Sequence, residues 1–160
     1  MFEAIRIECK IYHSSAFIED WEYAMRRDMQ EIVPGVYLGP YASAMKTKLD
    51  NLLAHGITHI ICIRQLIEAS FLRPNFPQHF NYLVLDIADS PTENIIKYFK
   101  QTRDFIDQCL QGGGKILVHG NGGISRSAAV VVAYIMVKFS LTCRFNDYWK
   151  FCVKIQMKAI

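Results

Sequence analysis

The sequence has few of the features that build a disulfide framework or a metal site. Its 160 residues include five cysteines, which form no C-x-x-C pair and no spacing typical of metal ligands. An odd number of cysteines fits free thiols in a reducing compartment better than a set of disulfides. We therefore expect no bound metal, and we expect no cofactor.

Long apolar runs and secretion signals are also lacking. The longest apolar run, residues 128–137, has only ten residues and is too short to span a bilayer. The N-terminal segment shows no basic flank followed by an apolar stretch, as a signal peptide would. We expect a protein of the cytoplasm and the nucleus that does not bind membranes.

A large excess of positive charge is absent as well. The net charge is +3, and residues 141–160 account for all of it, so the preceding residues are formally neutral. A nucleic-acid-binding domain is usually strongly basic, and we expect no such role. Residues 112–115 (GGGK) do not form a nucleotide-binding P-loop, because the upstream glycine spacing and the Ser or Thr after Lys are missing.

What the sequence does contain is a glycine-rich loop between an apolar strand and a helix. Residues 115–118 (KILV) predict a buried strand, and residues 125–139 predict a helix rich in alanine and other apolar residues. A loop that covers a helix N-terminus directs several backbone N–H groups at one point. The helix dipole adds a partial positive charge at the same point, which favours a bound anion.

The residues of this loop favour phosphate in particular. Its three glycines allow the backbone to approach an anion closely. Arg126 adds a planar guanidinium group that can bind two phosphate oxygens at once. A Gly-Gly pair alone would indicate only a turn, but its combination with this arginine is specific. The predicted phosphate-binding residues are Gly120, Asn121, Gly122, Gly123, Ile124, Ser125 and Arg126.

Several further segments, together with this loop, carry a resemblance to a known family. They are MQEI at 29–32, LGPY at 38–41, HGITHIICIRQ at 55–65, LVLDIAD at 83–89 and GISRSA at 123–128. With them, residues 28–139 resemble the dual-specificity phosphatases, and within that family the catalytically inactive members called pseudophosphatases. The resemblance implies the dual-specificity phosphatase fold and a site for phosphorylated residues.

The resemblance also implies which residue is missing. Active members carry His-Cys, five intervening residues, and then Arg followed by Ser or Thr. His119, Arg126 and Ser127 fall in this register, whereas Gly120 occupies the position of the nucleophilic cysteine. Phosphoryl transfer through this site needs a thiolate about 3 Å from phosphorus, which glycine cannot supply. We therefore expect no catalytic residue; the alternative is an enzyme that uses Ser125 or Ser127.

Other positions have roles that follow from the same resemblance. Asp89 matches the general acid of the family, a role that is vestigial here. It is either a turn residue before Pro91 or an acceptor for a hydrogen bond from a bound hydroxyamino acid. His119 is expected to shape the loop through hydrogen bonds, and Ser127 to tie the loop backbone or cap the helix. Cys62 is expected to be a buried strand residue and not a reactive thiol.

The rest of the pattern predicts alternating strands and helices. The expected strands are two short ones within 31–38, then 59–63, 82–85 and 116–118, and the expected helices are 42–54, 92–110 and 125–139. In the first of these helices, Leu49, Leu52 and Leu53 form the apolar side. This alternation predicts an α/β fold with a central, mostly parallel sheet flanked by helices. Phosphate would bind at the carboxyl end of a central strand.

We expect three segments along the chain. Residues 1–27 are an N-terminal extension that is partly helical, residues 28–141 are the pseudophosphatase domain, and residues 142–160 are a divergent basic tail. The C-terminal helices of the family are expected to be missing or replaced there. Lys150, Lys154 and Lys158 would share one face of a replacement helix; the alternative is a tail that belongs to a truncated or alternative isoform.

The predicted function is binding of phosphorylated Ser, Thr or Tyr residues without hydrolysis. A thiolate about 4 Å from a phosphate charge costs on the order of 4 kcal/mol per charge pair at an effective dielectric constant near 20, and Gly120 removes that cost. The resemblance implies partners among phosphorylated signalling proteins, such as mitogen-activated protein kinases, or active phosphatases with which this domain could compete as an anchor or shield. We expect a monomer. The alternative is an interaction scaffold that uses another surface, with residues 20–27 and the loop 64–79 as candidates.

Overall fold

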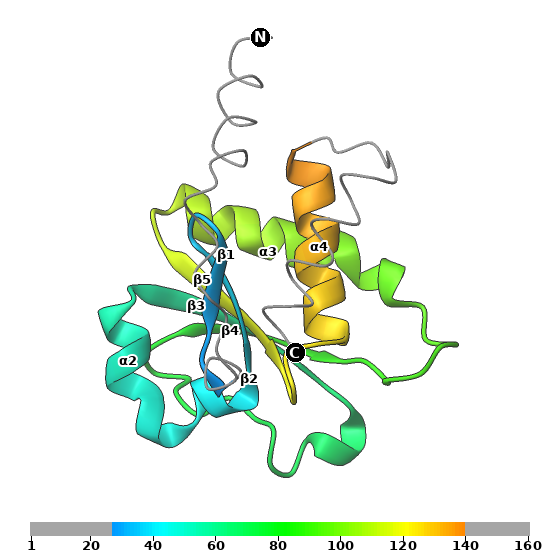
Figure 1. Ribbon diagram of the computed structural model, residues 1–160, viewed down its shortest axis with the longest axis horizontal. Coiled ribbons are helices and arrows are strands. Elements are labelled where there is room, and N and C mark those ends of the chain that lie inside the picture. The colour runs from blue at the N-terminus through cyan, green and yellow to red at the C-terminus, as the bar shows by residue number, and fades with distance from the viewer. Residues whose placement is uncertain (1–26, 140–160) are drawn as a thin grey trace, which may run out of the picture.

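The computed structural model describes residues 27–139, drawn in colour in Figure 1. The basic tail and all but the last residue of the expected N-terminal extension therefore lie outside the described residues. The same holds for the expectation that C-terminal helices are missing or replaced.

The described residues form a five-stranded sheet. The strand order is β1-β2-β5-β3-β4, in which β1 is antiparallel to β2 and all the other neighbours are parallel. The strands are β1 (Gln30–Val33), β2 (Val36–Pro40), β3 (Ile57–Arg64), β4 (Asn81–Asp86) and β5 (Lys115–Gly120). The prediction of a mostly parallel sheet is confirmed, and so is the pair of short strands around the turn at residues 34–35.

Helices cover both faces of this sheet, and β5 shows why. Its residues are almost completely buried and alternate between the faces, as the two-residue period of a strand requires. Ile116 and Val118 pack in one core with α3 (Phe99–Gln111) and α4 (Arg126–Lys138). Leu117 packs in the other core with Leu52 of α2 (Leu49–Ala54). Each fully buried apolar side chain of this size contributes about 1.5–3 kcal/mol to folding, so the central strand is firmly fixed.

The prediction of a helix over residues 42–54 is largely wrong. The chain instead forms two 3₁₀ turns, η3 (Tyr41–Ala44) and η4 (Lys46–Lys48), before the six-residue helix α2. Tyr41 N–H donates a hydrogen bond to Asn121 O at 3.0 Å, so contact with the glycine-rich loop sets the backbone here. Leu53 is also not on the apolar side, because it is 49% exposed while Leu52 is completely buried.

The helix expected over residues 92–110 begins later than predicted. Residues 92–94 are not helical, and η6 (Ile95–Tyr98) is a 3₁₀ turn that leads into α3. Ile106 and Cys109 face the core as expected, whereas Ile96 is 70% exposed. The last predicted helix is confirmed as α4, which starts one residue after Ser125.

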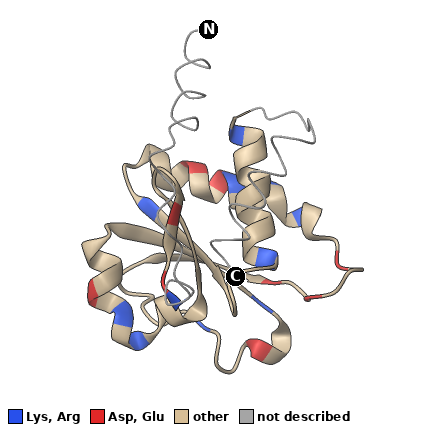
Figure 2. Ribbon diagram, viewed as in Figure 1, with Lys and Arg blue, Asp and Glu red and all other residues tan. Residues whose placement is uncertain are grey.

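Charges are dispersed over the described part of the chain. Figure 2 shows basic and acidic residues interspersed on the helices and loops. Several of them form surface ion pairs, including Lys100 with Asp104 and Lys97 with Glu93. Exposed pairs of this kind contribute little stability. Among residues 27–139, no helix has the length and apolar character needed to cross a membrane.

Candidate phosphate-binding site

The glycine-rich loop lies where a parallel sheet usually binds its ligand. β5 ends at Gly120 and α4 begins at Arg126, so the loop follows the carboxyl end of a strand that has neighbours on both sides. Ser125 precedes the helix, and its side chain makes no capping hydrogen bond. The N–H groups of the first turn of α4 therefore point at this loop without a side-chain cap, which suits an anion.

Gly123 fixes the path of the loop. Its φ angle is +75°, a conformation that residues with a side chain rarely adopt. A Cβ atom at this position would lie 2.7 Å from the carbonyl carbon and oxygen of Gly39 at the end of β2. The loop is thus packed against the backbone of the neighbouring strand, and only glycine fits.

We expect Gly123→Ala to destabilise the domain by more than about 2 kcal/mol. The left-handed conformation alone costs an alanine roughly 1–2 kcal/mol, and the collision with the Gly39 backbone adds to this. Gly122→Ala is the matched control, because its Cβ would meet only side-chain atoms of Ile124, the nearest at 3.5 Å. Urea denaturation of both variants measures the difference, and equal midpoints would contradict the argument.

Gly120 differs from Gly123 in having room for a side chain. A Cβ atom there would lie 3.4 Å from Ile63 O and 3.5 Å from Ser127 Oγ, which are ordinary contact distances. Ser127 is buried in the first turn of α4, next to this position. Position 120 therefore has room for a Cβ atom, unlike position 123.

Arg126 is buried at the base of the loop, where protein acceptors surround its guanidinium group. Its Nη1 donates a hydrogen bond to Ile87 O at 2.8 Å. Both Nη1 and Nη2 donate to Oε2 of Glu68, at 3.3 and 3.2 Å. Arg126 and Glu68 are only 9% and 8% exposed. The guanidinium group is thus held in one orientation before any ligand arrives.

The sequence interpretation missed Glu68. This residue ends the 3₁₀ turn η5 (Leu66–Glu68), which follows β3, and its carboxylate also accepts a hydrogen bond from Gln65 N–H at 2.7 Å. The segment reads as an ordinary polar loop. A glutamate within a run of apolar residues just after a central strand was the one available signal, because a buried carboxylate needs a cationic partner.

Asp89 belongs to the site and is more than a turn residue. Its Oδ1 accepts a hydrogen bond from Ser125 Oγ at 3.0 Å, and its Oδ2 lies 3.8 Å from Arg126 Nε. The structure thus joins the loop after β4 to the glycine-rich loop. Asp86 instead pairs with Arg64 at 2.9 Å at the end of the edge strand β4.

His119 is enclosed beneath the loop. It is 1% exposed, its Nδ1 lies 3.3 Å from Gly120 O, and its ring centroid lies 6.0 Å from that of Tyr41. Burial lowers the pKa of the imidazole to about 4, so the ring is neutral near pH 7. In this state it can donate a hydrogen bond from Nδ1 to the loop backbone, in line with the predicted shaping role.

We expect the stability of the domain to fall as the pH is lowered from 7 to 5, partly because of His119. The pKa of His119 is lower in the folded state than its usual value of 6.5. Below pH 6.5 the unfolded chain therefore binds more protons than the folded one, and this protonation lowers the free energy of unfolding. The effect is about 2 kcal/mol at pH 5. In urea denaturation, the free energy of unfolding of His119→Gln should change less with pH than that of the natural chain. His55→Gln, which changes an exposed histidine, is the control.

The cysteines of the described residues offer no replacement nucleophile. Cys62 and Cys109 are buried free thiols. Burial raises the pKa of Cys62 to about 12, so its thiolate is not populated at neutral pH. The prediction that Cys62 is an inert strand residue is confirmed. Within residues 27–139 there is also no group of three or more His, Cys, Asp or Glu side chains that could hold a metal ion.

Comparison with known proteins places this geometry in a family. The model of the dual specificity phosphatase catalytic domain matches residues 36–158. The chain belongs to the dual-specificity phosphatase family. It is 67% identical over 139 residues to the serine/threonine/tyrosine-interacting protein of Mus musculus and 68% identical to that of Homo sapiens. Each alignment covers 84% of this chain and 62% of the relative, so the chain spans less than two thirds of these relatives.

Solved and more distant members agree with this assignment. The crystal structure of the human tyrosine phosphatase-like serine/threonine/tyrosine-interacting protein is 56% identical, with a TM-score of 0.76, and the match covers 84% of this chain and 94% of that one. Dual specificity protein phosphatase 1 of Arabidopsis thaliana is 40% identical over 111 residues, which are 69% of this chain and 52% of that protein. The resemblance drawn from the motifs and the predicted fold class are both confirmed.

Proposed function

We propose that this domain binds phosphorylated Ser, Thr or Tyr residues of signalling proteins and does not hydrolyse them. The observation that supports the proposal is a glycine-rich loop between a central strand and a helix N-terminus, with a buried arginine at its base and glycine at position 120. Arg126 is oriented at its base, the N–H groups of α4 face it, and Gly120 has no side chain where the family has its cysteine. Such a site retains the attraction for a dianion and lacks the attacking atom.

The hydroxyl groups near the loop do not change this proposal. Ser125 Oγ donates its hydrogen bond to the Asp89 carboxylate at 3.0 Å, which gives it a neighbouring base that the sequence did not reveal. A carboxylate is a weak base toward an alcohol, so this hydrogen bond does not make Ser125 an efficient nucleophile. Ser127 is buried inside α4. Neither hydroxyl group therefore favours the enzymatic alternative.

In the cell, a domain of this kind would act as an anchor, a shield or a competitor. By covering a phosphorylated residue, it would prevent access by active phosphatases. We propose signalling proteins of the cytoplasm and the nucleus as its partners, among them mitogen-activated protein kinases. The relatives' name, serine/threonine/tyrosine-interacting protein, supports an interaction with these three residue types.

Calorimetric titration tests the proposal. A doubly phosphorylated Thr-x-Tyr peptide and its unphosphorylated twin are titrated into the natural chain and into Arg126→Lys. The lysine keeps the charge beside Glu68 but removes the planar fork. We expect phosphate-dependent binding to the natural chain, without release of phosphate, and weaker binding to the variant. Equal binding of both peptides by the natural chain would overturn the proposal.

One observation favours a second candidate function, that of a scaffold with a vestigial pocket. The donors of Arg126 are already directed at Glu68, Ile87 O and Asp89. A phosphate must then share this arginine with two carboxylates, which lowers its affinity for the site. Under this alternative, partners bind another surface, and they bind equally whether or not they are phosphorylated.

A further inference from the structure

The most exposed large apolar side chains of residues 27–139 belong to one short turn beside the phosphate loop. Leu66 is 75% exposed and Ile67 is 81% exposed, and Phe71, a few residues later, is 50% exposed. The phosphate loop adds Ile124, which is 44% exposed. Neighbouring apolar side chains that face water in this way are typical of interaction surfaces.

Hydrogen bonds fix the backbone of this turn, η5. Glu68 closes it twice, because its carboxylate accepts from Gln65 N–H and its carbonyl oxygen accepts from Leu72 N–H, each at 2.7 Å. The Leu72 side chain is completely buried, and its carbonyl oxygen accepts from Arg64 Nη1 at 3.0 Å. Leu66 and Ile67 are therefore presented on a fixed backbone. A ligand that docks on a preorganised surface loses less of its binding free energy to ordering.

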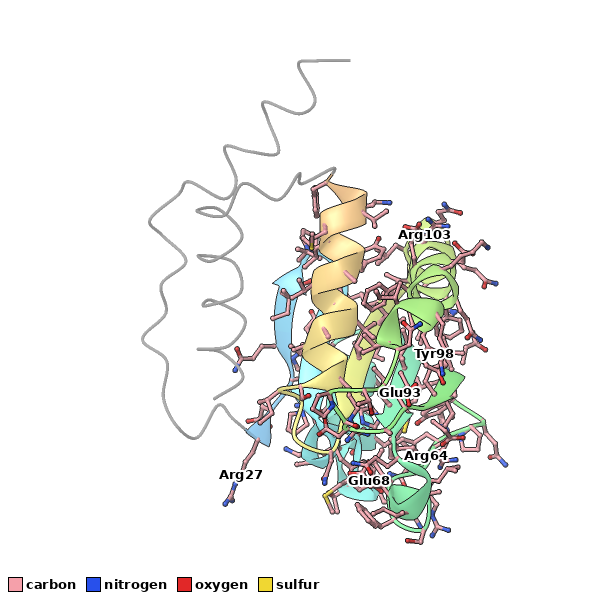
Figure 3. The ribbon with its side chains drawn as sticks, turned by 90° about the vertical axis from the view of Figure 1, so that its right-hand side faces the viewer. Arg27, Arg64, Glu68, Glu93, Tyr98 and Arg103 are labelled. Atoms are coloured by element: carbon pink, nitrogen blue, oxygen red, sulfur yellow. The ribbon has the colours of Figure 1, made fainter. Side chains whose placement is uncertain are left out.

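The same turn touches the phosphate site directly. Its last residue, Glu68, contacts the Arg126 guanidinium group, and Ile67 is the preceding residue, with its Cα about 3.8 Å from that of Glu68. Figure 1 shows the turn after β3 at the same end of the sheet as the start of α4, and Figure 3 places Glu68 at that end, beneath Arg64. The exposed apolar side chains of the turn therefore belong to residues that adjoin a direct contact of Arg126.

We propose that Leu66, Ile67 and Phe71 form a second contact for the phosphoprotein segment held at Arg126. The contact selects segments with a large apolar residue next to the phosphorylated residue. The occupant is an extended segment that combines a phosphate with apolar neighbours, because Glu68 of this turn contacts Arg126 and residues before and after Glu68 expose large apolar side chains. This inference rests on the proposed phosphate-dependent binding.

Fluorescence anisotropy with matched peptides tests the inference. One phosphopeptide carries Leu on both sides of the phosphorylated residue and the other carries Ser, and each has an unphosphorylated twin; the set is made with phosphotyrosine and with phosphothreonine. The proteins are the full natural chain, the double variant Leu66→Ser/Ile67→Ser, and Val137→Ser. Val137 is a matched control, because it is 59% exposed near the far end of α4.

We expect the natural chain to bind the Leu-flanked phosphopeptide at least about tenfold more tightly than the Ser-flanked one. Burial of a single leucine or isoleucine side chain is enough to lower the dissociation constant by about this factor. The double variant should lose this preference and retain binding of the Ser-flanked phosphopeptide, and Val137→Ser should keep both. Thermal melting checks that the variants fold.

The outcomes separate this inference from the proposed function. If the natural chain binds both phosphopeptides equally, or the folded double variant keeps the preference, the inference is overturned while phosphate-dependent binding stands. If the Leu-flanked peptide binds equally well without its phosphate, the turn is an independent docking surface, and the link to Arg126 is wrong. If neither phosphorylated peptide binds more tightly than its twin, the proposed function and the inference fall together.

Discussion

A Gly120→Cys variant is expected to hydrolyse p-nitrophenyl phosphate at least about a hundredfold faster than the natural chain. The substitution adds the one group that the site lacks. A Cβ at this position meets Ile63 O at 3.4 Å and Ser127 Oγ at 3.5 Å, so the side chain fits without displacing the backbone. Arg126 and Asp89 already lie at the loop, where they would hold the phosphate and protonate the leaving oxygen.

Three further variants make this expectation specific. Gly120→Ser has nearly the same size but no readily formed anion, so it should remain at background. Gly120→Cys combined with Asp89→Asn should lose most of the activity that Gly120→Cys gains, because the general acid is then missing. A Gly120→Cys protein that folds, binds phosphate and still shows no turnover would mean that the loop does not place phosphorus in line with residue 120.

The strand, the glycine-rich loop and the helix that follows it could be predicted from the sequence, because the pattern that encodes them is local. The strand, the glycines and Arg126 lie within a dozen residues, and each has a direct physical reason to be there. The sheet was predictable for a similar reason: apolar runs such as β5 carry the two-residue alternation that both cores require. Gly123 was recognised as a loop residue, but its close approach to the Gly39 backbone could not be predicted, because it depends on how the loop packs against β2.

The sequence did not predict the contacts between segments that are far apart along the chain. Glu68 is far from Arg126 in the sequence, and the apolar residues around it indicate at most that it is buried, not that a guanidinium group is its partner. The hydrogen bond between Asp89 and Ser125 likewise joins two separate loops. Tyr41 starts a 3₁₀ turn in place of the predicted helix, because its backbone is bound to the phosphate loop and tertiary contacts override helix propensity.

The largest loss of stability is expected from Arg126→Ala. The variant would leave the Glu68 carboxylate, which is 8% exposed, without its cationic partner, and would remove the donor to Ile87 O. Breaking a buried ion pair by deleting one member typically costs about 3–5 kcal/mol, because an uncompensated charge stays buried. Urea denaturation measures this loss. Lost peptide binding in this variant would therefore not separate a missing phosphate contact from a damaged fold.

A double-mutant cycle with Glu68→Gln resolves that ambiguity. If the pair is coupled as its geometry indicates, Arg126→Ala should destabilise a Glu68→Gln protein by much less than it destabilises the natural chain, since no buried charge is left unpaired. Glu68→Gln alone should also bind phosphate more tightly, because a negative charge beside Arg126 is removed. Additive losses of stability, together with unchanged phosphate affinity in Glu68→Gln, would show that Glu68 neither holds Arg126 nor competes with phosphate for it.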